Sequence, residues 1–172
     1  MKPGRGKAKG RSFENEVAKL LTEWSGVTWK RVPMSGGWHK DIITGDIFCS
    51  AEYEKGSTIR VPISIEIKKQ ESFNIIHLFK ETTGLVDSWW EQATTDAKKA
   101  SKVPVVIFSK NYCPVFIIAP TKLLSRISNL YKKRGLFDNL RQIRCSLRGE
   151  AVTILLLDDF LEKVEFKVLL QV

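Results

Sequence analysis

The chain has 172 residues, a length suited to one domain with its own hydrophobic core. Hydrophobic residues make up 43% and charged residues 27%, and no apolar run approaches the roughly 20 residues that span a bilayer. This composition excludes a membrane anchor, and we expect a cytoplasmic protein. The net charge of +9 makes nucleic acid the first partner to consider, because excess Lys and Arg attract polyanions.

The cysteines and histidines exclude several kinds of chemistry. Cys49, Cys113 and Cys145 lie too far apart for a C-x-x-C motif, and their odd number cannot form a closed disulfide set. With only His39 and His77, the chain offers few parts for a zinc site or a histidine-based triad. The function must be sought among acidic and basic residues.

The N-terminus divides into a basic segment and a helix. Residues 1–11 contain five basic and no acidic residues, which predicts a flexible basic arm, and residues 12–172 are predicted to form a single domain. Ser12 can cap a helix that runs to about residue 24. Its apolar residues follow the spacing of one helical face: Phe13, Val17, Leu20, Leu21 and Trp24.

The next segment favours strands. Residues 27–32 are rich in β-branched and aromatic residues, and the loop 33–45 carries several glycines. Strands at 46–52 and 59–69 flank turn residues at 55–57, which predicts a hairpin.

Helices and strands alternate in the remaining chain. Residues 74–100 favour a helix, most firmly over 88–100, and 103–109 is a continuous apolar run typical of a strand covered on both faces. We further predict a strand at 114–119, a basic helix at 121–133, a strand at 151–156 and a helix at 158–163. This order predicts an α/β fold with a mixed central β-sheet flanked by helices.

Two predicted neighbouring strands carry acidic and basic residues that can converge. Alternation places Glu66 and Lys68 on one face of a strand, and Asp46 begins the strand beside it. Two carboxylates repel each other unless a cation lies between them, and their hard oxygen ligands suit Mg²⁺ or Mn²⁺. The alternative is an ordinary exposed strand face, which is the usual context of an E-x-K sequence.

A metal at this place would suit phosphodiester hydrolysis. It would lower the pKa of a bound water and offset charge on a scissile phosphate. Lys68 could orient the nucleophile or stabilise the developing negative charge. These residues therefore indicate a nuclease.

Four sequence blocks resemble a known family when taken in order. The blocks resemble Holliday junction resolvases of the archaeal type and their phage relatives, within the PD-(D/E)XK nuclease superfamily. The resemblance implies a restriction-endonuclease-like core, and it adds little beyond Pro120. The blocks are KGRSFENEVAKLL at 9–21, RVPMSGG at 31–37, GDI at 45–47 and IEIK at 65–68, followed by WWEQA at 89–93 and VPVVIF at 103–108.

The resemblance implies a metal site. Asp46, Glu66 and the carbonyl of Ile67 would bind Mg²⁺, with Mn²⁺ as a substitute, and Glu14 on the first helix would complete the acidic cluster. Lys68 would be the catalytic lysine. These roles are implied by the family pattern, not by the periodicity of the chain.

The resemblance also implies contacts with DNA. Ser35 would serve the catalytic site and, with Arg31, would contact the scissile strand. A basic arm can follow a phosphate backbone with salt-dependent affinity. The expected further DNA contacts are Lys7, Lys9, Arg11 and Lys69.

Two choices among acidic residues stay open on the sequence. Gly45 precedes Asp46 where the superfamily name has proline, which leaves Asp41 as a rival, although Asp46 opens a β-rich segment and Asp41 lies in the loop. Glu14 and Glu16 both border the apolar stripe of the first helix. Only the family pattern selects Glu14.

Other residues have both a functional and a structural interpretation. Gln92 either faces the site or is an ordinary surface residue. Trp89 and Trp90 either stack on bases or belong to the core. The basic segment 122–148 either contacts DNA or is an exposed face.

The predicted function is a metal-dependent, structure-selective DNA endonuclease, a Holliday junction resolvase that acts in DNA recombination on four-way junctions. The two-fold symmetry of that substrate predicts a homodimer. The alternatives are another PD-(D/E)XK nuclease acting on flaps, single strands or restriction-like sites, and a non-catalytic DNA-binding protein. If phage-encoded, the protein would work in the host cytoplasm.

Overall fold

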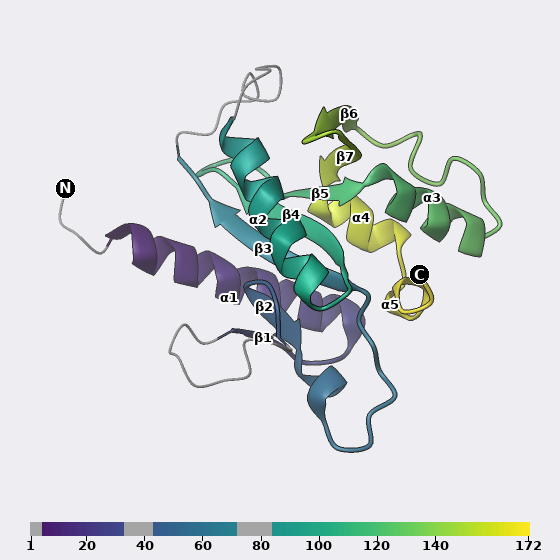
Figure 1. Ribbon diagram of the computed structural model, residues 1–172, viewed down its shortest axis with the longest axis horizontal. Coiled ribbons are helices and arrows are strands. Elements are labelled where there is room, and N and C mark those ends of the chain that lie inside the picture. Colours follow the sequence, from purple (N-terminus) through teal and green to yellow (C-terminus); the bar gives the residue numbers. More distant parts are fainter. Residues whose placement is uncertain (1–4, 33–42, 72–83) are drawn as a thin grey trace.

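The fold is a single mixed sheet with helices on both faces, as predicted (Figure 1). The computed structural model describes residues 5–32, 43–71 and 84–172, with side chains from residue 8. The elements in chain order are α1 (Arg5–Ser25), β1 (Trp29–Arg31), β2 (Ile47–Cys49), the 3₁₀-helix η1 (Ser50–Tyr53), β3 (Ile63–Lys69), α2 (Leu85–Lys99), β4 (Val103–Ser109), β5 (Phe116–Pro120), α3 (Thr121–Leu130), β6 (Gln142–Leu147), β7 (Glu150–Leu156), α4 (Leu157–Lys163) and α5 (Phe166–Leu169).

The seven strands lie in the order β1-β2-β3-β4-β5-β7-β6. The pair β3 and β4 is parallel, in register from Ile63 opposite Val103 to Lys69 opposite Ser109, and the other neighbouring strands are antiparallel. A parallel pair needs a crossover connection, and α2 lies within it. Figure 1 shows α2 in front of β3 and β4.

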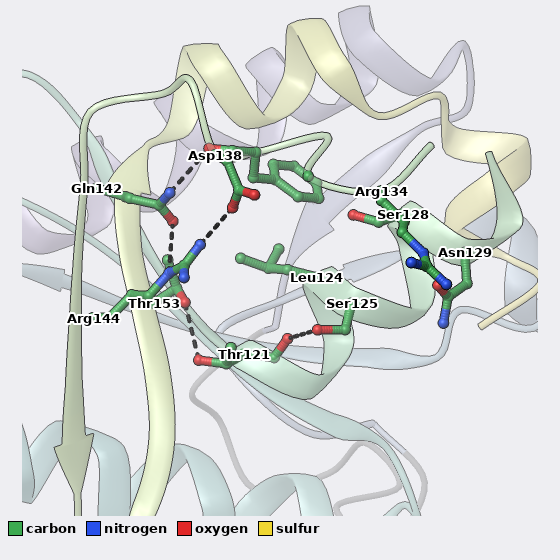
Figure 2. A pocket seen from close by; sticks show the side chains of 12 residues that line it. Thr121, Leu124, Ser125, Ser128, Asn129, Arg134, Asp138, Gln142, Arg144 and Thr153 are labelled. Atoms are coloured by element: carbon green, nitrogen blue, oxygen red, sulfur yellow. Dashed lines mark hydrogen bonds and ion pairs between the residues drawn. The ribbon is translucent and has the colours of Figure 1, made fainter. Parts of the chain in front are cut away.

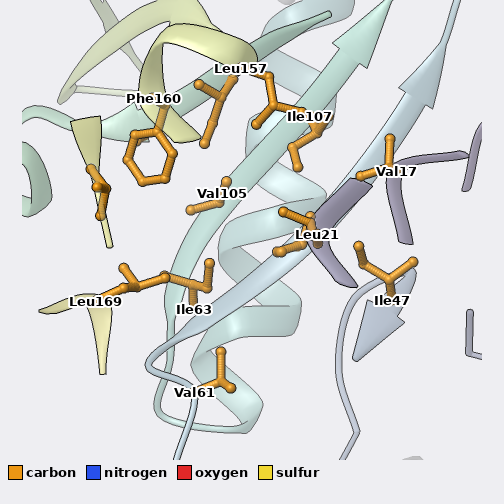
Figure 3. Packing of buried hydrophobic residues seen from close by; sticks show 14 of the residues in the cluster. Val17, Leu21, Ile47, Val61, Ile63, Val105, Ile107, Leu157, Phe160 and Leu169 are labelled. Carbon is orange, nitrogen blue, oxygen red and sulfur yellow. The ribbon is translucent and has the colours of Figure 1, made fainter. Parts of the chain in front are cut away.

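The two faces of the sheet belong to two hydrophobic clusters. On β4, Val105 and Ile107 join the cluster of α1, α3, α4 and α5, part of which is drawn in Figure 3. Val106 and Phe108 join the cluster beneath α2. All four side chains are at most 2% exposed, so the predicted burial of this strand on both faces is confirmed.

Several predicted elements are confirmed with small shifts of boundary. The strand at 103–109 and the antiparallel pairing of the strands after 46 and before 69 are found, although β2 and β3 are shorter than predicted. The basic helix after Thr121 ends at Leu130 instead of residue 133. The part of the predicted helix before residue 84 lies outside the described residues.

Some elements of the fold differ from the prediction. α1 begins at Arg5, so the predicted start at Ser12 is wrong and most of the basic segment belongs to the helix. Lys, Arg and Ala are good helix formers, which offsets the unfavourable glycines in this segment. The edge strand β6 and the short helix α5 were not predicted.

In the parts of the chain that the structure describes, no helix has the length and apolar character to cross a membrane.

Candidate active site

Glu66 and Lys68 lie side by side on the α2 face of β3. The Lys68 ammonium is 2.5 Å from Glu66 Oε1 and 3.0 Å from the side-chain oxygen of Gln92 on α2. The Glu66 side chain is only 2% exposed. The predicted placement of this acid and lysine on one face is confirmed, but the face is covered by a helix and is not an open strand surface.

Asp46 is fixed to the side of β3 that pairs with β2, beside Glu66. Its N–H donates to the carbonyl of Ile65 at 2.8 Å, and its carboxylate accepts the N–H of Ile67 at 2.7 Å. The Asp46 carbonyl accepts the N–H of Val32 at 2.8 Å. Three hydrogen bonds therefore hold this acid where β2 begins, as the sequence predicted. The rival Asp41 lies outside the described residues.

The glycine before Asp46 has a structural reason. Gly45 has φ of +83°, and a Cβ at this position would run into the backbone of Ile65. Proline is restricted to φ near −65° and cannot adopt this conformation. The chain therefore needs glycine where the superfamily name has proline, because Asp46 approaches β3 through a tight left-handed turn.

Replacing Gly45 with alanine should destabilise the protein and displace Asp46. The left-handed backbone costs a non-glycine residue about 1–2 kcal/mol, and the clash with Ile65 adds to this cost. The control is Gly56→Ala, because Gly56 has φ of +80° and open space where the added methyl group would lie. Urea denaturation should show a clearly larger loss for Gly45→Ala, and equal losses would contradict the close approach.

Glu14 faces the cluster from α1 and is paired with Arg31. The two side chains approach to 3.6 Å, and both are partly buried. The Arg31 NH1 nitrogen is inaccessible and has no hydrogen-bond partner among the described residues. Glu16 is exposed on the other side of the helix. Of the two acids left open by periodicity, Glu14 is the one near Asp46.

Burial raises the pKa of all three acids, and the charge of Asp46 raises the pKa of the other two further. Burial, and then the Asp46 charge, raise the pKa of Glu66 to about 7. Burial also raises the pKa of Asp46, against the opposing hydrogen bond from Ile67. The pKa of Glu14 is raised by burial and by Asp46. Carboxylates in such a setting are stabilised by protons or by a bound cation.

The oxygen atoms at the edge of β3 fit a hard divalent cation. Asp46 and Glu66 are adjacent, and the carbonyl of Ile67 points to the same side of β3 as the N–H that Asp46 accepts. Among the described residues, no three His, Cys, Asp or Glu side chains are grouped closely enough to hold a metal ion. The structure thus brings two carboxylates together, and Glu14 stands apart from them in its pair with Arg31.

The predicted DNA-contacting residues are spread around this edge. Lys9 pairs with Glu71 at 3.2 Å, and Arg11 is exposed on α1. The Lys69 ammonium lies 4.7 Å from the centre of the Phe13 ring and 3.3 Å from the Ser109 hydroxyl. Two further predicted contacts, Ser35 and the side chain of Lys7, lie outside the described residues.

Two residues of α2 also act on the candidate site. The sequence left the role of Gln92 open and gave no role to Asp96. Gln92 binds Lys68, and Asp96 raises the pKa of both Asp46 and Glu66 by its charge. Their spacing of four residues places them on one face of α2. That spacing can be found in the sequence, but only the packing of α2 on β3 shows that this face of the helix covers the strand.

A separate polar pocket lies between α3 and β6, away from these acids. It has a volume of about 260 Å³, and its floor includes a hydrogen bond between Thr121 and Thr153 (Figure 2). Arg144 at its wall is paired with Asp138 at 2.6 Å. No residue predicted for the catalytic site lines this pocket.

Comparisons with known proteins identify a family and a relative of the chain. The model of the family described as "Phage putative PDDEXK endonuclease" matches residues 5–171. Protein D14 of Escherichia phage T5 is 26% identical over 104 residues, which are 60% of this chain and 63% of that protein. No solved structure matches the chain. The match of the family model over nearly the whole length shows that the chain belongs to the phage PDDEXK endonuclease family.

Proposed function

We propose that the protein is a metal-dependent DNA endonuclease that hydrolyses phosphodiester bonds. The observation that carries the proposal is the buried Glu66 beside Asp46, with the Lys68 ammonium in contact. Burying a carboxylate is costly unless its charge is paired or binds a metal ion. Perturbed acids of this kind are typical of functional sites.

Each side chain at the edge of β3 has a role in this reaction. Asp46, Glu66 and the Ile67 carbonyl would hold Mg²⁺ or Mn²⁺, which would supply a water of lowered pKa and offset phosphate charge. Lys68 donates to the phosphate oxygen on which negative charge develops. Gln92 holds the Lys68 ammonium in place at 3.0 Å.

Glu14 and Arg31 support the same site from α1 and β1. Glu14 would be the third acid of the cluster, and its pair with Arg31 limits the negative charge close to Asp46. Arg31 is proposed to contact the scissile strand from its place in the sequence blocks. Ser35 is proposed for the same strand from its place in the sequence.

The proposed substrate is branched DNA, with the four-way junction as the leading form. The support is the resemblance of the four sequence blocks to junction resolvases, together with the excess of basic residues. A homodimer would place two such sites on a two-fold symmetric junction. Each subunit would cut one strand.

The proposal is tested by incubating the protein with labelled junction, flap, duplex and single-stranded DNA, in Mg²⁺, in Mn²⁺ and in chelator. We expect cleavage only with metal, and faster cleavage of the junction than of the plain duplex. Equal cleavage of junction and duplex would reject the resolvase assignment. Binding without metal-dependent cleavage of any substrate would favour a non-catalytic DNA-binding protein.

A further inference from the structure

A second, apolar pocket lies on the same face of the sheet as Lys68. It has a volume of about 400 Å³ and opens over β4, β5, β7 and the start of β6. Its walls include Phe116, Ile154 and Leu156, while Pro114 and Arg141 are exposed residues of its lining. Nothing in the proposed phosphodiester chemistry uses this pocket.

Strand register connects this pocket to the candidate active site. Lys68 lies opposite Phe108, Phe108 opposite Phe116, and Phe116 opposite Leu156. These four residues form one row across the sheet. With neighbouring strands about 4.8 Å apart, Phe116 lies roughly 10 Å from the backbone of Lys68. A nucleotide beside the scissile phosphate spans such a distance.

The lining of the pocket combines a flat aromatic surface with a cation. The partly exposed ring of Phe116 provides this surface, and it is stacked on the buried ring of Phe108, with centroids 5.3 Å apart and planes at 21°. Arg141 is exposed and makes no ion pair with any residue that the structure describes. A nucleotide has the matching chemistry, since its base has an apolar face and its phosphate is anionic.

The charge of the neighbouring edge strand argues against a second copy of this chain as occupant. β6 forms the end of the sheet, and Arg141, Arg144 and Arg148 lie along or next to it. Arg144 and Arg148 are paired with Asp138 and Glu91, so Arg141 is the one of the three without an ion pair among the described residues. Two copies of this edge related by a two-fold axis would bring the two Arg141 side chains toward each other, whereas a phosphate would offset the charge of Arg141.

We propose that this pocket takes an unpaired nucleobase of the DNA, next to the cleaved bond, with Arg141 on a neighbouring phosphate. The inference rests on the proposed nuclease function and deepens it, because a base at a branch point can lack a stacked neighbour on one side and then leaves the helix at lower cost than a base within a duplex. A duplex keeps its bases stacked and cannot fill the pocket without breaking a pair.

The test measures binding in chelator, so that cleavage plays no part. The probes are a labelled duplex with one unpaired adenine and the same duplex with an abasic analogue at that position. Anisotropy titrations should show about tenfold tighter binding of the adenine probe by the unaltered protein. Phe116→Leu should reduce this ratio to less than twofold, because it removes the flat surface and keeps an apolar side chain.

Arg141→Gln should weaken binding of both probes and reduce the salt dependence by about one released counterion. Tyr53→Leu and Arg126→Gln are matched controls, because they remove an exposed aromatic and an exposed arginine elsewhere and should leave the ratio unchanged. Thermal melts check the folding of every variant. If Phe116→Leu fails to fold, Phe116→Met provides the same comparison.

The inference is overturned by a ratio near one for the unaltered protein, or by a tenfold ratio that persists in folded Phe116 variants. It is also overturned if sedimentation shows that Phe116→Leu converts a dimer to a monomer, since a second copy would then cover the pocket. Loss of metal-dependent cleavage on every substrate, with the binding ratio intact, would reject the nuclease proposal and leave this one standing.

Discussion

Glu66→Gln is expected to lower the rate of DNA cleavage by roughly a thousandfold or more, because it removes a charged metal ligand from the centre of the site. Glutamine has nearly the same shape and can still accept a hydrogen bond from Lys68. DNA binding should therefore stay within a few-fold of the unaltered protein. Single-turnover cleavage in Mg²⁺ measures the first effect, and titration in chelator measures the second.

The matched control for this substitution is Glu16→Gln. Glu16 is an exposed acid on α1, and its replacement changes the net charge by the same amount without touching β3. Cleavage by this variant should match that of the unaltered protein. A Glu66→Gln protein that still cuts at a comparable rate would remove Glu66 from the catalytic site.

The stability of the metal-free protein should fall as the pH rises from about 4.5 to above 7. Glu66 has an ordinary pKa of 4.5 when unfolded and about 7 when folded, so the folded state holds a proton that the unfolded state has lost. The folded state binds more protons in this window, and the free energy of unfolding decreases with pH. The loss reaches up to about 3 kcal/mol once the folded carboxyl ionises.

Urea denaturation in chelator between pH 4 and 8 measures this slope. Glu66→Gln should flatten the slope and should be more stable than the unaltered protein at pH 8. Mg²⁺ should counteract the loss in the unaltered protein more than in the variant, because binding to the folded state stabilises it. A slope that is identical in both proteins would contradict the raised pKa.

Much of the site could be predicted from local pattern. The alternation of Ile65, Glu66, Ile67 and Lys68 fixes which side chains share a face, because the period of a strand is two. The position of Asp46 followed from the start of a β-rich segment. The contact between Asp46 and Ile67 agrees with both inferences.

Other features depend on contacts between segments that are distant in the sequence, so no local sequence pattern predicts them. The choice between Glu14 and Glu16 depends on how α1 lies over the sheet, which brings Arg31 within 3.6 Å of Glu14. β6 alternates polar and apolar residues over only six positions and contains an arginine, so the pattern is weak. The positive φ angles of Arg148 and Gly149 show that a tight turn joins it to β7.

The way in which β2 is attached to β3 affects how a loss of activity in Asp46 variants is interpreted. Only Ile47 and Ile65 are paired in register between these strands, and the Asp46 carboxylate accepts the N–H of Ile67 on β3. The Asp46 carboxylate is thus both part of the candidate site and a link between the start of β2 and β3. Asparagine retains an acceptor for this hydrogen bond and reports on catalysis alone. Alanine also removes the side-chain hydrogen bond between the start of β2 and β3, so its lost activity would have two causes that a rate measurement cannot separate.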